Sequence, residues 1–427
     1  MANGIFSGDG TLESPYLIED AQDINAINPK LSENPFVYFK MTNDIDMTLE
    51  GFKMIGNTSE GPPLMGEFDG DGHTLSGINM VKDPGSYDSS FAVFGQMSGD
   101  KAVVKNIIIK DMTITLESSD SAALIVANTS GPCLIENCYA EGTIEAKQAF
   151  VGGIGAYLSN STIRNVTVKL NGSGHKVGGI IYSASDCIIE NCSATGDVKG
   201  YNDYSSLSAT INTTSGETKI KNIVSTINIE NKYNGEFNYS KLVPFFDTES
   251  ESTTIENSFV ALNGLLYSDW SEFYAYYKDK IVKGTDGKLY KCTSYQVAEN
   301  TSFRPIDGGN WAEHWHPIEI ENTLTPVQLK NQNNYVGWDF ENTWVITSSG
   351  PVLKLFYVEE VEPGGDNGSG NSGNKDPVDI VIVTDVDFSK TKLIRDVLES
   401  PIPQVWDHEN EQFVPLTLQM IELMIKR

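Results

Sequence analysis

VVKNIIIK at residues 103–110 and TIRNVTV at residues 162–168 are two of six copies of one short pattern. Each copy runs from a branched apolar residue through a polar residue to an asparagine and a mostly apolar segment; the other four are LIENCYA (134–140), IIENCSA (188–194), KIKNIVS (219–225) and TIENSFV (254–260). Their asparagines, Asn106, Asn137, Asn165, Asn191, Asn222 and Asn257, follow one another at steps of 31, 28, 26, 31 and 35 residues. Such a period, with β-branched residues and Gly-rich spacers, is typical of stacked β-coils. The pattern predicts a β-solenoid in which the asparagines form a ladder along one edge.

The residues before the repeat predict the beginning of this solenoid. The segment GDGTLESPYLIEDAQDINAI (8–27) indicates a turn, a strand and a short helix, with Asp20 as N-cap before Ala21–Ile27. An amphipathic helix at this place commonly covers the open end of a solenoid core. Strands are expected around Tyr38–Met41, followed by a Gly-rich hairpin over Glu67–Met80. Paired glycines in VGGIGAY (151–157) and VGGIIYS (177–183) permit tight corners between strands.

Four of the five cysteines fall on the repeat. Cys133 and Cys138 have the spacing C-x4-C, as do Cys187 and Cys192, and two such pairs suggest a zinc site or disulfides. The repeat offers a second interpretation, because Cys138 and Cys192 follow the asparagine where other copies hold apolar residues. Free cysteine behaves as a small apolar residue in protein cores. We therefore expect stacked core positions and no metal.

The charge of the chain restricts its partners. The formal net charge is −28 and the pI is about 4.4. A nucleic-acid-binding protein needs a basic surface to replace counterions, and an anionic membrane surface would repel this chain. No apolar run approaches the ~20 residues needed to span a bilayer, and residues 1–20 contain neither the basic nor the apolar part of a secretory signal. We expect no nucleic-acid partner, no membrane partner and no cofactor.

Several motifs resemble a known repeat family. GDGTLESPYLIEDAQDINAI, FKMTNDIDMT, MGEFDGDGHTLSGINM and VGGIG…IRNVTV are similar to the GLUG-type repeat β-helix of surface and phage virion proteins. YVGWDFENTWVITSSGPVLK (335–354) resembles the closing segment of such domains. The resemblance covers roughly residues 4–262 and 318–357. It implies an all-β fold, a right-handed parallel β-helix that acts as a scaffold without catalytic activity.

Between those two stretches the composition changes. Residues 266–317 are rich in aromatic side chains and resemble small chitin-binding-type carbohydrate-binding modules, which have a three-stranded sheet with a few exposed aromatics. The candidate sugar-stacking residues are Trp270, Tyr290, Trp311 and Trp315. Aromatic rings bind sugars by packing on the C–H face of the pyranose. Tyr290 and Trp311 match core positions of such modules, so packing is the competing interpretation for them, whereas packing explains Trp270 and Trp315 less well.

For catalysis the sequence offers weak candidates. Asp44 and Asp46 lie two residues apart in NDID, and a carboxylate pair is what glycoside hydrolases use. In this motif carboxylates more often cap backbone groups of turns. The five histidines are scattered, with no HExxH and no G-x-S-x-G. No catalytic residue and no metal ligand is therefore predicted, although the question of an enzyme stays open.

The C-terminal part differs from the rest. Residues 358–377 form a Gly/Ser/Asn-rich linker, and residues 378–427 follow as a small α/β tail. In this tail DIVIVTDVDF indicates a strand, whereas TKLIRDVLES and FVPLTLQMIELMIKR indicate helices. A short tethered segment with apolar faces suggests docking to a partner or self-association.

The sequence thus predicts five parts: a β-helix at 1–265, a carbohydrate-binding-like insertion at 266–317, closing β-helix strands at 318–357, the linker, and the docking tail. The function expected from these parts is a non-catalytic bacteriophage virion protein, a tail or head fibre or a capsid-decorating adhesin, that binds host-surface polysaccharide. Other virion proteins would bind the C-terminal segment 378–427, and the chain could also associate with copies of itself as a homo-oligomer. The protein would assemble in the host cytoplasm and reside in the virion. The alternatives are a polysaccharide depolymerase with its active site on the β-helix and a bacterial adhesin at the extracellular surface.

Overall fold

The computed structural model describes residues 6–56, 61–82, 88–118, 120–200, 206–208, 210–230, 241–243, 253–261 and 323–357, together with short strands at 268–269, 275–276, 281–283, 289–292, 296–297, 315–318, 404–407 and 412–415. The chain divides into two compact units, residues 1–381 and 382–427. All statements below about the structure refer to these residues.

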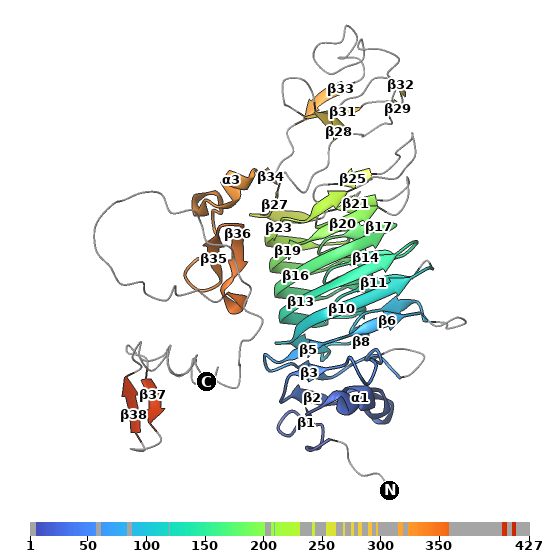
Figure 1. Cartoon of the computed structure of the whole chain (residues 1–427), viewed down its shortest axis with the longest axis vertical. Coiled ribbons are helices and arrows are strands. Elements are labelled where there is room, and N and C mark those ends of the chain that lie inside the picture. The colour runs from blue at the N-terminus through green and yellow to red at the C-terminus, as the bar shows by residue number, and fades with distance from the viewer. Residues whose placement is uncertain are drawn as a thin grey trace. The chain divides into compact units, whose positions relative to one another are not determined.

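The first unit contains a parallel β-solenoid of about six turns, so the predicted fold class is confirmed. Figure 1 shows its strands stacked coil upon coil along one axis. Sheet A has seventeen strands: β1 (Tyr16–Ile18), β2 (Tyr38–Met41), β3 (Ile45–Asp46), β4 (Glu67–Asp69), β5 (Thr74–Ser76), β6 (Asn79–Val81), β9 (Val103–Lys105), β10 (Ile108–Leu116), β13 (Leu134–Ala146), β16 (Thr162–Gly174), β19 (Ile188–Thr195), β20 (Asp197–Gly200), β23 (Lys219–Ser225), β24 (Asn228–Glu230), β26 (Thr254–Glu256), β27 (Phe259–Ala261) and β34 (Thr323–Leu324).

Two smaller parallel sheets form the remaining sides of the coils. Sheet B contains β8 (Phe94–Ser98), β12 (Val126–Ser130), β15 (Gly155–Ser159), β18 (Ile181–Ser185) and β22 (Ile211–Ser215). Sheet C contains β7 (Ser90–Phe91), β11 (Ser121–Ala123), β14 (Phe150–Gly152), β17 (Lys176–Gly178), β21 (Ser206–Ser208) and β25 (Lys241–Val243). Between β7 and β24 each coil passes through sheet C, then sheet B, then sheet A.

The core consists of columns of equivalent residues from successive coils. Ile135 lies in register with Val104 on one side and Ile163 on the other, and all three side chains are fully buried. The column continues through Ile189 and Ile220. Because successive residues of a strand face opposite sides, the branched residue before each polar residue points inward. Full burial of one such side chain stabilises a fold by roughly 1.5–3 kcal/mol.

The four cysteines of the repeat belong to the solenoid core, so their interpretation as core residues is confirmed. Cys138 is in register with Val166, which is in register with Cys192. Cys133 and Cys187 occupy a neighbouring inward column. All five cysteines are free and buried. Within the described residues, no group of three or more His, Cys, Asp or Glu side chains is placed to hold a metal ion.

The predicted Gly-rich hairpin over Glu67–Met80 is wrong. β4, β5 and β6 run parallel to their neighbours in sheet A: β4 pairs with β2 and β9, and β5 with β3 and β10. The glycines and aspartates between β4 and β5 turn a corner of the coil, with Asp71 at φ 48° and Gly72 at φ 81°. The segment that resembles a hairpin turn occupies, in this coil, the position that the asparagine corner occupies in later coils.

The helix predicted at the N-terminal end is present and covers the first coil. α1 runs from Ala21 to Glu33, through Pro29, so it is longer than expected. The side chain of Asp20 accepts hydrogen bonds from the backbone N–H groups of Gln22 and Asp23 at 2.8 and 3.1 Å, which confirms it as the N-cap. Ile24, Ile27 and Leu31 join the solenoid core. In Figure 1 the helix lies at the end of the stack nearest the N-terminus.

A long insertion interrupts the other end of the solenoid. Ser225 in β23 lies in register with Val260 in β27, and Val260 lies in register with Thr323 in β34. The first step is 35 residues, as in the sequence repeat, whereas the second is 63 residues. The chain therefore leaves sheet A after β27 and returns to the adjacent position of the same sheet.

The closing segment differs from the expected strands of the β-helix, because only β34 joins the solenoid. α3 (Pro326–Leu329), η3 (Gln332–Asn334), the antiparallel pair β35 (Trp344–Thr347) and β36 (Gly350–Leu353), and η4 (Lys354–Phe356) follow it. Their apolar residues cluster with Val224 and Phe259 from sheet A. Phe356 packs on Tyr139 with ring centroids 5.7 Å apart, so the segment lies along several coils. Figure 1 shows β35 and β36 beside the solenoid.

In the second unit the structure describes one antiparallel hairpin, β37 (Gln404–Asp407) with β38 (Gln412–Pro415). Residues 412–415 are thus a strand, although the sequence indicated the beginning of a helix there. The other predicted elements of the tail lie outside the described residues.

Candidate functional site

The inserted segment has a sheet of its own. β30 (Ile281–Lys283), β31 (Leu289–Cys292) and β33 (Trp315–Ile318) are antiparallel neighbours, and β28 (Ser268–Asp269) pairs with β30. A second pair joins β29 (Ala275–Tyr276) to β32 (Gln296–Val297). The register places Cys292 opposite Trp315 and Tyr290 opposite Pro317. Tyr290, Cys292 and Trp315 are buried, so one face of this small sheet forms a core.

Of the four predicted sugar-stacking residues, two are buried in this module and two lie outside the described residues. Tyr290 is 3% exposed and Trp315 is fully buried, so both rings pack inside the inserted module. For Trp315 the reason is strand alternation, because it shares the buried face with Cys292 while its neighbour His316 is exposed. Trp270 and Trp311 lie outside the described residues. The sugar contacts predicted for them stay predictions.

Asp44 and Asp46 both accept hydrogen bonds from backbone N–H groups. Asp44 accepts a hydrogen bond from the backbone N–H of Thr74 at 2.7 Å and lies 3.4 Å from Nδ1 of His73. Asp46 accepts from the backbone N–H of Thr48 at 2.9 Å and from its hydroxyl. These hydrogen bonds from the Thr48 side chain and backbone lower the pKa of Asp46, which favours the ionised form. Both carboxylates therefore fill the capping role that the turn interpretation gave them.

The outer face of sheet A carries a charge ladder that the sequence reasoning missed. It consists of Lys40, Asp69, Lys105, Glu136, Arg164, Glu190, Lys221 and Glu256, each in register with the next. Its signs alternate throughout. The polar residue before each asparagine was the available signal, because from Lys105 onward it alternates between basic and acidic along the chain.

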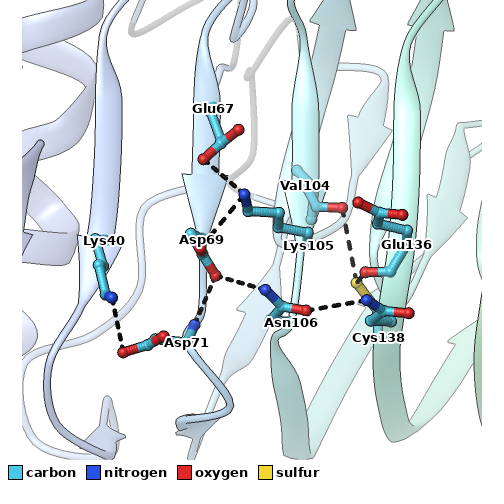
Figure 2. Close-up of polar contacts among 10 residues, drawn as sticks. Lys40, Glu67, Asp69, Asp71, Val104, Lys105, Asn106, Glu136 and Cys138 are labelled. Atoms are coloured by element: carbon cyan, nitrogen blue, oxygen red, sulfur yellow. Dashed lines mark hydrogen bonds and ion pairs between the residues drawn. The ribbon is translucent and has the colours of Figure 1, made fainter. Parts of the chain in front are cut away.

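Several neighbours in the charge ladder form ion pairs. Arg164 binds Glu136 at 2.7 Å, and Lys105 lies 3.0 Å from Glu67 and 3.5 Å from Asp69. Figure 2 shows Lys105 between these two carboxylates. Burial opposes the charge on Lys105, but the two carboxylates outweigh burial and raise its pKa. The cluster of acidic groups on this face is thus matched by cations and has the character of a structural network.

Next to the charge ladder runs the predicted asparagine ladder. The side-chain amide of Asn137 donates to the side-chain carbonyl of Asn106 at 3.2 Å, and the same contact joins Asn165 to Asn137, Asn191 to Asn165 and Asn222 to Asn191 at 3.0–3.2 Å. The first step is an aspartate, since Asn106 donates to Asp69 at 2.9 Å (Figure 2). All six repeat asparagines have φ between 46° and 55°, the left-handed region that asparagine tolerates better than most residues. The ladder is therefore a structural edge of the solenoid.

A second column of left-handed corners also escaped the sequence reasoning. It consists of Gly99, Gly131, Asn160, Asp186 and Gly216, with φ between 51° and 99°. Each follows a serine, at steps of 32, 29, 26 and 30 residues, so the signal was in the sequence. A side chain at Gly216 would meet the Asp186 carboxylate at 2.0 Å. Glycine suits this position because the φ of 59° costs it nothing and the Asp186 carboxylate occupies the space that a Cβ would take.

Comparisons with known proteins agree with the fold and leave the function open. No family model matches the chain. The chain is 29% identical over 179 residues to Halomucin from Haloquadratum walsbyi, which covers 40% of this chain and 2% of that protein. It is 29% identical over 118 residues to a "Putative Gly-rich membrane protein" from Evansella cellulosilytica, covering 26% of this chain and 13% of that protein. The chain thus spans a small fraction of each relative.

Among solved structures, a "putative immunoglobulin A1 protease" from Bacteroides ovatus has a similar fold. The TM-score is 0.51 with 18% sequence identity, over 82% of this chain and 94% of that one. At this identity the likeness supports the β-solenoid and nothing about chemistry. In the described part of this chain, no helix is long and apolar enough to cross a membrane.

Proposed function

We propose that this chain is a non-catalytic display protein in which the solenoid supports an inserted module that binds cell-surface glycans. The more specific form of the proposal is a bacteriophage virion protein, a tail or head fibre or a capsid-decorating adhesin. That form rests on the GLUG-type motifs in the sequence. A bacterial surface adhesin would use the same binding chemistry.

One observation carries the proposal, the return of the chain to sheet A after the insertion. Ala261 and Leu324 are neighbours in the sheet, although 62 residues lie between them. A segment that leaves a sheet and rejoins it at the next position is an accessory to the scaffold, since the coils continue without it. The solenoid needs no part of residues 266–317 for its ladder, so these residues are available for binding.

The buried residues of the insertion narrow the choice of binding side chains. Tyr290, Cys292 and Trp315 supply its core, and they use the buried face of the small sheet. The proposal therefore assigns sugar stacking to Trp270 and Trp311. Single sites of this kind are weak, and many copies on one particle would raise the overall avidity by orders of magnitude.

The depolymerase alternative has less support. A general acid must keep its proton near the working pH, which requires a raised carboxyl pKa. The pKa of Asp46 is shifted in the opposite direction, and Asp44 accepts a hydrogen bond from the backbone N–H at the start of β5. Release of reducing sugar from host capsule by the wild-type chain, lost in an Asp44→Asn/Asp46→Asn variant, would favour the enzyme over the display protein.

Glycan-array binding by the full chain tests the proposal. We expect wild type to bind at least one surface glycan, and Trp270→Ala or Trp311→Ala to weaken that binding at least tenfold, because one stacked ring contributes ~1.4 kcal/mol or more. Phe36→Ala is the matched control, an exposed aromatic that precedes β2 and lies far in sequence from the insertion. Wild type that binds no glycan, or tryptophan variants that bind as wild type does, would overturn the proposal.

The virion form of the proposal has a separate test. Purified phage particles should contain the chain, and deletion of residues 378–427 should remove it from the particles while leaving it folded in lysates. A chain found only in the bacterial envelope fraction would favour the bacterial adhesin.

A further inference from the structure

Three aromatic side chains form a compact cluster on the outside of the solenoid, away from the inserted module in sequence. They are Phe150 from β14 in sheet C and Tyr157 and Tyr182 from β15 and β18 in sheet B. Ring centroids of Phe150 and Tyr182 lie 5.1 Å apart in a stacked arrangement, and Tyr157 meets Tyr182 edge-on at 5.1 Å. Phe150 and Tyr157 are 5.9 Å apart. Each ring therefore touches the other two.

The cluster sits where the outer sides of sheets B and C turn toward each other. Two residues, Gly153 and Ile154, connect β14 to β15. A Cβ on Gly152 would lie 1.8 Å from the carbonyl oxygen of Gly155, so the outer sides of the two strands meet closely at this turn. One coil earlier, the Asn128 side chain of sheet B bonds to the Ser90 hydroxyl of sheet C. Glycine at position 152 allows this close approach of the two strands.

The rings are held in place and partly accessible. Tyr182 is 6% exposed and lies outside the solenoid core, whereas Tyr157 is 38% exposed and Phe150 is half-buried. The hydroxyl groups of Tyr157 and Tyr182 are hydrogen-bonded to each other, and burial is the main cause of the raised pKa of both. The buried Tyr182 ring thus packs against Tyr157 and holds it in place. A pre-organised ring costs little side-chain entropy when a ligand packs on it.

Polar residues lie in register with both Phe150 and Tyr157. Phe150 lies between Ser121 and Lys176 in sheet C, and Tyr157 lies between Asn128 and Ser183 in sheet B. The ammonium group of Lys176 is 5.6 Å from the centre of the Phe150 ring. Rings flanked by hydroxyl, amide and ammonium groups provide stacking for the C–H face of a sugar and partners for its hydroxyls.

We propose that Phe150, Tyr157 and Tyr182 form a second carbohydrate-binding site, on the solenoid itself, for a polysaccharide strand. The size of the cluster favours a sugar over a protein partner. A stable protein interface covers about 800 Å² on each side, whereas one aromatic side chain offers at most 150–250 Å² and Tyr182 is already covered. The binding proposed here does not require the inserted module, and it would give one molecule two contacts on the same glycan.

The test uses the full chain in five forms: wild type, Tyr157→Ala, Tyr157→Phe, Trp270→Ala/Trp311→Ala, and the triple variant that combines Tyr157→Ala with both tryptophan changes. Each is assayed by affinity electrophoresis in gels containing a neutral polysaccharide (β-glucan or glycol chitin) or an acidic one (alginate or hyaluronan). We expect the Trp270→Ala/Trp311→Ala chain to keep measurable retardation in at least one gel. In the triple variant, the added Tyr157→Ala change should lower the remaining apparent affinity at least tenfold. Tyr157→Phe should bind as wild type does, because the ring remains. Retardation confined to acidic gels would show that Lys176 selects charged sugars, and retardation in neutral gels would show that stacking is enough.

The outcomes separate this site from the inserted module. If the Trp270→Ala/Trp311→Ala chain binds nothing while wild type binds, the solenoid site is wrong and the module proposal stands. If Tyr157→Ala abolishes binding and the tryptophan variants do not, the module proposal is wrong and the solenoid site stands. A change of oligomeric state in Tyr157→Ala by sedimentation velocity, without loss of sugar binding, would identify the cluster as a contact between copies and overturn the proposal. Thermal melting checks that each variant is folded, which we expect for Tyr157→Ala because that ring is exposed.

Discussion

At the scale of single residues, asparagine solves two problems at the same corner. The backbone there has φ near 50°, which costs most residues about 1–2 kcal/mol. The same side chain donates to one neighbouring coil and accepts from the other, as Asn165 does with Asn137 and Asn191. Glycine would tolerate the backbone conformation but would lose the hydrogen bonds of the ladder. Serine would neither tolerate this conformation as well nor provide the amide that donates and accepts. The six copies of the repeat therefore use one residue type at this corner.

Replacement of Asn165 should separate these two contributions. Asn165→Ala loses two amide hydrogen bonds and strains the backbone, so we expect the free energy of unfolding to fall by about 2–4 kcal/mol. Asn165→Gly keeps the left-handed conformation and should cost less. Urea unfolding measures both. Asn160→Gly is the control, an exposed asparagine at φ 51° outside the asparagine ladder, and should be nearly neutral. Equal losses for alanine and glycine at position 165 would show that the backbone conformation is unimportant.

At the scale of strands, register follows from columns of like residues inside and alternating charges outside. Inward columns of isoleucine, valine and cysteine pack at every level of sheet A. The charge ladder adds a condition, since each strand must find a neighbour of opposite sign. Single surface ion pairs contribute little, about 0–1 kcal/mol each. Their alternation over eight residues disfavours pairing of two strands that carry the same charge.

Reversal of one charge should test this condition. Arg164→Glu would place three glutamates in consecutive coils, and we expect a loss of stability on the order of 1 kcal/mol at low salt. Thermal melting at increasing NaCl should show the loss shrinking, because salt screens exposed charges. Lys219→Glu makes the same change of charge beside Ile188 and Thr254, outside the charge ladder, and is the control. A loss that is equal in both variants would reflect net charge alone.

The cysteine column predicts a response to alkaline pH. Burial raises the pKa of Cys138 and of Cys192 from 9.0 to about 12. The unfolded thiols ionise near pH 9 while the folded ones stay neutral, so the contribution of each thiol to stability is complete below pH 9 and is lost as pH rises toward 12. At one pH unit above 9, ionisation of each thiol in the unfolded chain lowers the free energy of unfolding by about 1.4 kcal/mol.

A Cys138→Val/Cys192→Val variant checks this response. The column already holds Val166 and Ile223, so we expect the variant to fold. Its urea midpoint should fall less steeply than that of wild type between pH 9 and pH 11. Parallel profiles would mean that other groups, such as buried tyrosines, account for the whole alkaline loss.

At the scale of the whole first unit, the closing segment covers an apolar outer face of sheet A that would otherwise be exposed to water. Tyr139, Val224 and Phe259 point outward from sheet A, and residues of 324–356 pack on them. Trp338 anchors this cover. Its indole N–H donates to the carbonyl of Asn257 at 2.7 Å, and its ring lies 4.3 Å from that of Trp344.

Removal of this anchor should release the cover and leave the coils. Trp338→Ala is expected to weaken the packing of residues 325–357 by about 3–5 kcal/mol, the usual cost of a large aromatic side chain. Limited proteolysis with mass spectrometry should then find early cuts in that segment. The stack up to β23 should persist, because each coil depends mainly on its neighbours. Val336→Ala, 75% exposed in the same segment, is the control. Cleavage that is the same in both variants, or loss of the whole solenoid, would contradict the prediction.

Much of the solenoid could be predicted from the sequence because its signals are local and repeat. The N-cap at Asp20, the asparagine ladder and the inward cysteines each follow from residues close in the chain. The hairpin expected at 67–80 failed because DGDG has the composition of a tight turn, and only the parallel neighbours β2 and β9 show that it is a corner. For the proposed sites, the sequence indicated aromatic residues in the insertion but not that Trp315 faces inward.

The sequence by itself determined the period, the inward columns and the asparagine ladder, since each depends on the order of a few neighbouring residues and recurs from coil to coil. Tertiary structure alone decided which side chains from different coils and segments meet. Phe150 and Tyr182 are 32 residues apart and touch only because the coils stack in this register. Likewise, the outward Val224 and Phe259 are buried only because a segment from beyond the insertion folds back over them. The physical reason is that short-range order follows from backbone preference and side-chain alternation, whereas contacts between distant segments depend on the path of the whole chain.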